Sequence, residues 1–200
     1  MKVASLTALT FSGSRPYVCV EMNYFAYGSN LNTGHLRSWL MRSDVDFEEL
    51  GPARRMILPG YRLRTNYLRS IGLGACNIES SSRSRVEGIV MTVTPSVREA
   101  LRLKEGHPHR YAEIEIVVTP FGMKRRVRAF TYIVTPRYYL PFDVPVTQEY
   151  RRLILEGAAS HRLSPRHQKH LRRVLRALCH ERVSSDELTT RIPIQHISAT

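Results

Sequence analysis

The chain has 200 residues and a mass of 23.0 kDa, which predicts one domain, because chains of this size usually bury a single hydrophobic core. Hydrophobic residues make up 42% of it and no apolar run approaches a bilayer span, so we expect a folded, soluble protein with no membrane partner. The 30 Lys and Arg against 17 Asp and Glu give a net charge of +13, which indicates attraction to something acidic without identifying it.

Three cysteines without a CxxC pair argue against a disulfide framework or a zinc knuckle and favour a reducing, cytoplasmic location. Residues 1–22 lack the sustained apolar region of a secretory signal, so we expect a loose N-terminal extension there. The domain is expected over residues 23–182, and the polar residues 183–200 read as a C-terminal tail.

The first predicted elements are a buried strand over residues 24–27, a tight loop at residues 28–30 and a helix over residues 33–41. Gly-Pro and Pro-Gly pairs then divide residues 44–65 into short strands joined by turns. Gly and Ser make residues 67–85 read as a loop around a short strand at residues 75–78.

A strand is predicted over residues 86–93, followed by a helix over residues 97–103 with Ser96 as its N-cap and Glu99 completing a capping box. The remaining predicted elements are a hairpin formed by residues 111–119 and 125–134, and two helices over residues 147–159 and 165–182. Strands gathered between residues 23 and 134 with helices inserted and appended indicate an α+β fold. Its sheet is expected to be a small mixed, mostly antiparallel β-barrel with flanking helices.

The loop after the first strand can carry chemistry. Gly28 permits unusual backbone angles, Ser29 and Asn30 favour turns and caps, and a helix begins just beyond them. Such a loop can direct several backbone N–H groups at one point and so hold a carboxylate or an oxyanion. An ordinary strand-to-helix turn explains the same three residues.

Glu105 lies at the end of a predicted helix and directly before a strand. Shielding of Glu105 by the sheet would raise its pKa, which suits a group that takes up and releases protons. Lys104, Arg110 and the nearby histidines would instead favour the ionised carboxylate and keep its pKa low. Most glutamates at helix ends are simply solvated, so this position alone does not decide between the two interpretations.

In combination, the motifs resemble the γ-glutamylcyclotransferase family over about residues 23–175. The matching segments, in order, are YFAYGSNL at 24–31, VEGIV at 86–90, LKEG at 103–106, YRRLI at 150–154 and EGA at 156–158. The YGSN loop is the specific part of this likeness. Because the loop reads YGSNL and not the YGSLIW type of the glutathione-specific branch, we do not expect intact glutathione as substrate.

The resemblance implies a β-barrel whose cavity holds a γ-glutamyl group, with Glu105 as the catalytic general acid and base. It assigns substrate binding to Tyr150 and to the loop residues Tyr24, Phe25, Ala26, Tyr27, Gly28, Ser29 and Asn30. The implied reaction is intramolecular attack of the α-amine on the γ-carbonyl, which releases 5-oxoproline and a free amine and needs no metal or cofactor.

The other histidines and cysteines favour structural roles. No HxxxH or HExxH spacing indicates a metal site, although His167 and His170 lie three apart on a predicted helix. Cys76 has no base nearby in the sequence and is expected to be a packed thiol, and Trp39 to be core or barrel cover.

Two kinds of partner stay open within the cyclotransferase interpretation. A small γ-glutamyl amino acid or amine needs only a closed cavity, whereas a γ-glutamyl group on an acidic carrier protein would explain a basic surface. The alternative function is a non-catalytic basic module that contacts nucleic acid or an acidic protein through the Arg-rich segments 166–182 and 124–128. We do not expect nucleic-acid binding, because charge on an amphipathic helix is usually a solvated face.

Overall fold

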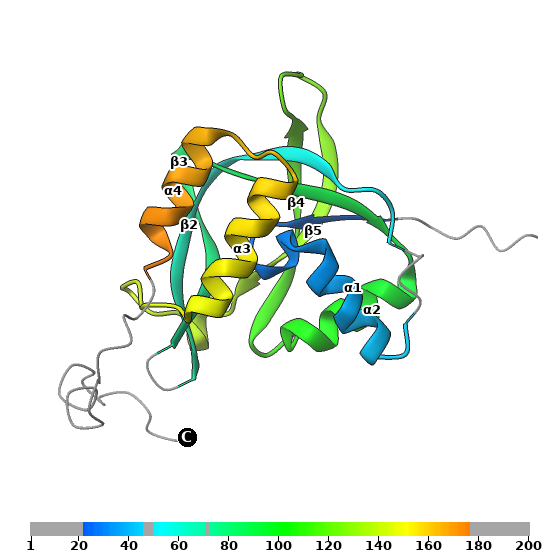
Figure 1. The fold of residues 1–200 in the computed structure, drawn as a ribbon, viewed down its shortest axis with the longest axis horizontal. Helices are drawn as coiled ribbons and strands as arrows, with labels where there is room; N and C mark the ends of the chain where they lie inside the picture. The colour runs from blue at the N-terminus through cyan, green and yellow to red at the C-terminus, as the bar shows by residue number, and fades with distance from the viewer. Residues whose placement is uncertain (1–21, 46–49, 71–72, 177–200) are drawn as a thin grey trace, which may run out of the picture.

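The computed structural model describes residues 22–45, 50–70 and 73–176 (Figure 1). Most of the expected N-terminal extension and all of the expected C-terminal tail lie outside these residues. Five strands form a closed barrel in the order β1-β3-β2-β4-β5. They are β1 (Met22–Ala26), β2 (Arg54–Ser70), β3 (Leu73–Val93), β4 (Tyr111–Pro120) and β5 (Val127–Val134).

Barrel closure depends on one parallel contact, between β1 and β5, while the other four strand pairs are antiparallel. The expected mixed, mostly antiparallel barrel is therefore confirmed. Closing the sheet on itself leaves no open edge to pair with another chain.

The strands β2 and β3 are much longer than the sequence pattern predicts. The predicted turn at Pro59-Gly60 was wrong: β2 continues through it, Gly60 takes a φ of +77°, and the pairing register shifts because residues 81–84 of β3 lie opposite Gly60 alone. The predicted loop over residues 67–85 was wrong, because β3 runs through it and pairs with β2 on both sides of the shift. A Pro-Gly or Ser-rich segment suits either a turn or a bulge, and only the partner strand decides between them.

Four α-helices flank the barrel in the described residues (Figure 1): α1 (Thr33–Arg42), α2 (Pro95–Glu105), α3 (Gln148–Ser160) and α4 (Pro165–Val174). A short 3-10 turn, η1 (Ser29–Leu31), precedes α1, and another, η3 (Pro136–Tyr138), follows β5. The predicted N-cap of α2 was wrong: Thr94 accepts from the N–H of Val97, and Pro95 occupies the first turn. The last helix ends at Val174, before its predicted end at residue 182, and residues 177–182 lie outside the described part.

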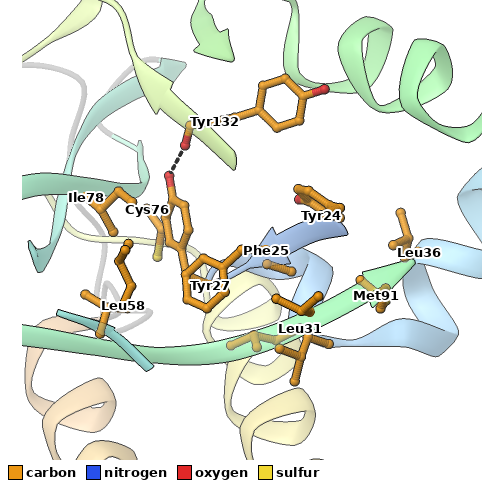
Figure 2. Packing of buried hydrophobic residues seen from close by; sticks show 14 of the residues in the cluster. Tyr24, Phe25, Tyr27, Leu31, Leu36, Leu58, Cys76, Ile78, Met91 and Tyr132 are labelled. Atoms are coloured by element: carbon orange, nitrogen blue, oxygen red, sulfur yellow. Dashed lines mark hydrogen bonds between the residues drawn. The ribbon is translucent and has the colours of Figure 1, made fainter. Parts of the chain in front are cut away.

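The core gathers side chains from the barrel and from the helix entry (Figure 2). Phe25 of β1, Leu58 of β2, Met91 of β3 and Leu31 of η1 are all buried. Trp39 of α1 is partly buried against this core, as expected of a barrel cover.

The helix α3 lies directly on the loop that enters α1. A Cβ atom added to Gly157 would stand 2.4 Å from the backbone carbon of Leu31, so only glycine permits this approach. The same helix carries Tyr150, whose hydroxyl accepts from the backbone N–H of Cys76 on β3 at 3.0 Å. The contact between α3 and η1 therefore places two of the expected site segments side by side.

Candidate active site

The loop after β1 presents backbone donors and one amide side chain. Two backbone hydrogen bonds form the turn: the N–H of Leu31 donates to the carbonyl of Gly28, and the N–H of Asn32 donates to the carbonyl of Ser29. Among the backbone hydrogen bonds outside helices and strands in the described residues, none is donated by the N–H groups of residues 28–30. Asn32 caps α1 by accepting from the N–H of His35 at 3.0 Å. The loop therefore enters α1 through two turn hydrogen bonds and a side-chain cap.

Glu105 is the last residue of α2, and Gly106 ends that helix in the left-handed region with a φ of +66°. The amide nitrogen of Asn30 donates to Glu105 Oε1 at 2.9 Å and to the Tyr24 hydroxyl at 2.8 Å. The fold thus joins Glu105 to the YGSN loop across 75 positions of sequence.

Asn30 also carries an acceptor that the described protein does not use. The residue is 4% exposed, and its Oδ1 atom is buried without a hydrogen-bond partner among the described residues. A buried acceptor without a donor is costly, so this atom is suited to a ligand that brings an N–H or O–H group. Its neighbour Glu105 makes a positively charged donor the best match.

These residues line one small pocket of about 40 Å³. Its walls comprise Tyr24, Tyr27, Gly28, Ser29, Asn30, Cys76, Glu105, Tyr111, Thr131, Tyr132 and Tyr150. Five of the eleven are tyrosines, so the pocket combines apolar ring faces with hydroxyl groups. Phe25 and Ala26 are not among the lining residues; their side chains are buried behind the pocket.

Hydrogen bonds fix the tyrosines of the pocket wall. The Tyr27 hydroxyl donates to the carbonyl of Tyr132 at 2.6 Å, a contact drawn in Figure 2, and the Tyr111 hydroxyl donates to the carbonyl of Cys76 at 2.9 Å. Burial, and next the negative charge of Glu105, raise the pKa of Tyr24 and Tyr27 above the ordinary value. The wall therefore keeps its hydroxyl protons near neutral pH.

Cys76 is a buried thiol in this wall, and burial raises its pKa to about 12. A thiol in that state is a poor nucleophile at neutral pH, which agrees with the expectation of a packed thiol. In the described residues, no group of three or more His, Cys, Asp or Glu side chains is placed to hold a metal ion.

A second carboxylate supports the pocket from behind. Glu113 of β4 accepts from Arg102 Nε and from the Tyr132 hydroxyl, each at 3.1 Å, and also pairs with Arg98. Burial alone would raise its pKa, but hydrogen bonds from Arg98, Arg102 and Tyr132 lower it to about 2. Because both arginines belong to α2, this cluster ties the helix that carries Glu105 to the barrel.

A wider chamber of about 310 Å³ adjoins the pocket. The two share Ser29, Glu105, Tyr111 and Tyr150, so Glu105 stands at the boundary between them. The chamber is also lined by His35, Tyr67, Ala75, Lys104, Arg110, Thr147, Glu149 and Leu153. Arg110 folds back over Gly106, with its Cδ 3.0 Å from where a Cβ on Gly106 would stand.

Sequence reasoning missed part of this site. Thr131, Tyr132 and Tyr111 line the pocket, but none belongs to a motif with a chemical reading of its own. Tyr132 and Thr131 lie inside a predicted strand, where alternation predicts burial and nothing more. Tyr111 opens a strand directly after Glu105, which is the only signal that pointed toward it.

No helix in the described part of the chain is long and apolar enough to cross a membrane. No curated protein matches this sequence.

Solved structures share the fold. A gamma-glutamyl cyclotransferase is 22% identical with a TM-score of 0.68, over 85% of this chain and 99% of that one. The uncharacterized human protein loc79017 is 24% identical with a TM-score of 0.66, over 85% of this chain and 96% of that one. YkqA from Bacillus subtilis is 24% identical with a TM-score of 0.66, over 80% of this chain and 56% of that one.

The sequence itself matches a family over residues 24–157, a range that includes Glu105, the YGSN loop and Tyr150. This range spans more than half of the chain and contains all five strands except for the first two residues of β1. The chain therefore belongs to the gamma-glutamyl cyclotransferase, AIG2-like family.

Proposed function

We propose that this chain cyclises a γ-glutamyl amide to 5-oxoproline and a free amine, with Glu105 as general acid and base. One observation carries the proposal: Asn30 joins the Glu105 carboxylate to the Tyr24 hydroxyl inside a pocket and keeps a buried acceptor for a ligand. Membership of the cyclotransferase family supports the same chemistry.

The pocket has groups for both charges of a γ-glutamyl unit. The α-ammonium is expected to lie between Glu105 and the Oδ1 atom of Asn30, because both accept hydrogen bonds there. The N–H groups of residues 28–30 are suited to an α-carboxylate or to an oxyanion at the γ-carbon. Folding the donor between these sites brings its own amine toward its own carbonyl.

The reaction needs only proton transfers from the protein. Glu105 takes a proton from the α-ammonium, and the freed amine nitrogen attacks the γ-carbonyl carbon to close a five-membered ring. The tetrahedral intermediate then breaks its bond to the leaving nitrogen, which receives protons through Glu105. The products are a lactam and a released amine that leaves as ammonium, so atoms and charges balance.

The adjoining chamber is the expected site of the leaving amine, because Glu105 lies between it and the pocket. Two cations, Lys104 and Arg110, line this chamber together with the carboxylates of Glu105 and Glu149. In the described residues, the Arg110 guanidinium forms no ion pair within 4 Å. We therefore expect donors whose leaving amine bears a carboxylate to be preferred over those whose leaving amine is neutral.

The proposed catalytic role is tested with Glu105→Gln, which keeps the size and shape of the side chain but removes the basic carboxylate. Wild type is incubated with γ-glutamyl amino acids, γ-glutamyl amines and a γ-glutamyl carrier protein, and 5-oxoproline is measured by mass spectrometry. We expect the variant to lose about 1,000-fold in kcat on the best donor. The exposed Glu115→Gln on β4 is the matched control and is expected to stay within about twofold.

Full turnover by Glu105→Gln would contradict the role of Glu105. No 5-oxoproline from any donor with wild type would contradict the proposed function itself and favour the non-catalytic binding module.

The leaving-group preference is tested with two donors of similar size, γ-glutamyl-alanine and γ-glutamyl-ethylamine, of which only the first bears a carboxylate on the leaving side. We expect Arg110→Gln to lower kcat/KM about tenfold for the alanine donor and less than twofold for the ethylamine donor. Arg137→Gln, a cation outside the chamber, serves as control. An equal loss on both donors would show that Arg110 acts on the loop of Glu105 and not on the leaving group.

A further inference from the structure

The β4–β5 hairpin carries a surface that the proposed reaction does not use. It extends beyond the helices at the top of Figure 1. Its last registered pair is Val118 with Val127, and the tip comprises residues 119–126. At the opposite end of the same strand, Tyr111 lines the pocket, so the tip lies roughly 30 Å along the strand from the site.

The hairpin exposes three large apolar side chains, two of them in the tip. Val117 is 41% exposed, Phe121 43% and Met123 66%. The hairpin therefore holds three of the seven exposed large hydrophobic residues in the described part of the chain, within seven positions of sequence. Such a cluster on a projecting hairpin is a candidate contact surface, because isolated exposed apolar residues are ordinary but grouped ones are not.

The sequence of the hairpin turn is rich in cations, and the acid next to it in the sequence is Glu115 on β4. Residues 116–129 contain Lys124, Arg125, Arg126 and Arg128 and no Asp or Glu. A fifth cation, Arg55 of β2, lies with its guanidinium carbon 3.6 Å from the centre of the Phe121 ring. Arg55 also donates to the Arg162 carbonyl, which links the tip of the hairpin to the turn between α3 and α4.

We propose that the tip of the β4–β5 hairpin docks on an anionic lipid bilayer. The apolar side chains would enter the boundary between headgroups and acyl chains, while the cations behind them would contact lipid phosphates. A nucleic-acid backbone would match the cations but would leave Met123 and Val117 without an apolar partner. Arg55 already covers one face of the Phe121 ring, which leaves less of that ring for stacking on a base.

This proposal revises the expectation of no membrane partner. That expectation depended on the lack of a long apolar run, and adsorption through a hairpin tip requires no such run. Docking at the tip would leave the pocket open to its substrate, because the two lie at opposite ends of β4.

The test is flotation of the full-length protein with vesicles of phosphatidylcholine, alone or with about 30% phosphatidylglycerol. We expect wild type to bind only the anionic vesicles. We expect the variant Phe121→Ser with Met123→Ser, which keeps every charge, to bind about tenfold more weakly. We expect a similar loss for Lys124→Gln with Arg125→Gln and Arg126→Gln, and for wild type in high salt.

The matched control removes three exposed cations from helices outside the hairpin, Arg37, Arg42 and Arg172, each replaced by Gln. It is expected to bind the anionic vesicles within about twofold of wild type. Circular dichroism melts are expected to be the same for all variants, because every substituted side chain is exposed.

Two results would overturn the proposal. One is a loss of vesicle binding in the matched control equal to that in the hairpin charge variant, or unchanged vesicle binding by the serine variant. In either case net charge alone would explain the adsorption. The other is binding of a short DNA duplex through Lys124, Arg125 and Arg126 by a protein that does not float with anionic vesicles. Neither result depends on the cyclisation reaction.

Discussion

The side-chain amide of Asn30 donates hydrogen bonds to two groups of the site. Both of its N–H hydrogens are used, one toward Tyr24 and one toward Glu105, and its oxygen is left for a ligand. An alanine at this position could hold neither group. The loop residue and the carboxylate therefore depend on each other, although they lie 75 positions apart.

We expect Asn30→Ala to lower kcat/KM about 100-fold, because the carboxylate loses the donor that orients it. The free energy of unfolding is expected to fall by about 2 kcal/mol, since the Tyr24 hydroxyl loses a buried partner. Steady-state kinetics and urea unfolding measure the two effects. Asn23→Ala, which removes a hydrogen bond to the Arg128 carbonyl, is the control and is expected to leave kcat/KM unchanged.

The family resemblance pointed to some residues of the pocket wall and not to the rest. Tyr24, residues 27–30, Glu105 and Tyr150 all line the pocket, in keeping with their expected place in the site. Phe25 and Ala26 belong to the same motif but are buried outside the pocket lining; for Phe25 the reason is that successive side chains of a strand point to opposite faces. Tyr132 and Thr131 come from a strand that only barrel closure brings beside β1.

At the scale of elements, the contact between α3 and η1 decides where the loop lies. Gly157 permits backbone contact with Leu31 and Asn32, and Tyr150 reaches the pocket from the same helix. In the sequence, the EGA segment at 156–158 has no meaning beyond its part in the family likeness. Its physical role is this close approach of two backbones.

Gly157→Ala is expected to destabilise the protein by about 3 kcal/mol, because the new methyl group would overlap backbone that cannot move as a side chain can. The displaced loop is also expected to raise KM. Thermal or urea unfolding and donor kinetics measure these changes. Ser160→Ala, at the exposed end of the same helix, is expected to change stability by less than about 0.5 kcal/mol; an equal loss there would contradict the contact argument.

Element boundaries show where sequence patterns are ambiguous. Periodicity predicted α1 and α3 to within a residue or two, since an apolar face at helical spacing and a cap are both local signals. The same sequence patterns predicted several short strands in place of β2 and β3, because Pro59-Gly60 and the serines at 80–82 are typical of turns and loops. Pairing between the two strands is a non-local contact, and it carries the chain through these residues as bulged strand.

At the scale of the whole molecule, α4 is attached to the barrel through a buried polar contact. Glu87 of β3 is 2% exposed and accepts from the backbone N–H of Ser164, which caps α4. His167 is buried beside it and its Nε2 atom has no partner among the described residues. Burial lowers the pKa of His167 to about 4, against a smaller opposing effect of Glu87.

This lowered pKa predicts acid sensitivity. Below about pH 4 the histidine is protonated in both folded and unfolded chains, and above its ordinary value of 6.5 it is neutral in both. Between these values only the unfolded chain binds the proton, so the contribution to stability is complete above pH 6.5 and is lost as the pH falls toward 4. The loss is expected to reach at most about 3 kcal/mol.

The measurement is urea unfolding from pH 4 to 8 for wild type and for His167→Gln. The variant is expected to show a flatter dependence in this window, because its side chain binds no proton. His109→Gln, which is exposed, is expected to follow wild type. If His167→Gln shows the same pH dependence of stability as wild type, the acid sensitivity comes from other groups and the prediction is contradicted.

The sequence by itself determined the class of fold and the family likeness, because these depend on residue type and on local spacing; the roles of the YGSN loop and of Glu105 stay predictions from that likeness. Only the tertiary structure decided which side chains meet. Barrel closure joins β1 to β5, α2 delivers Glu105 to Asn30, and α3 brings Tyr150 to Cys76. Each of these contacts links residues dozens of positions apart, and no local pattern encodes such a distance.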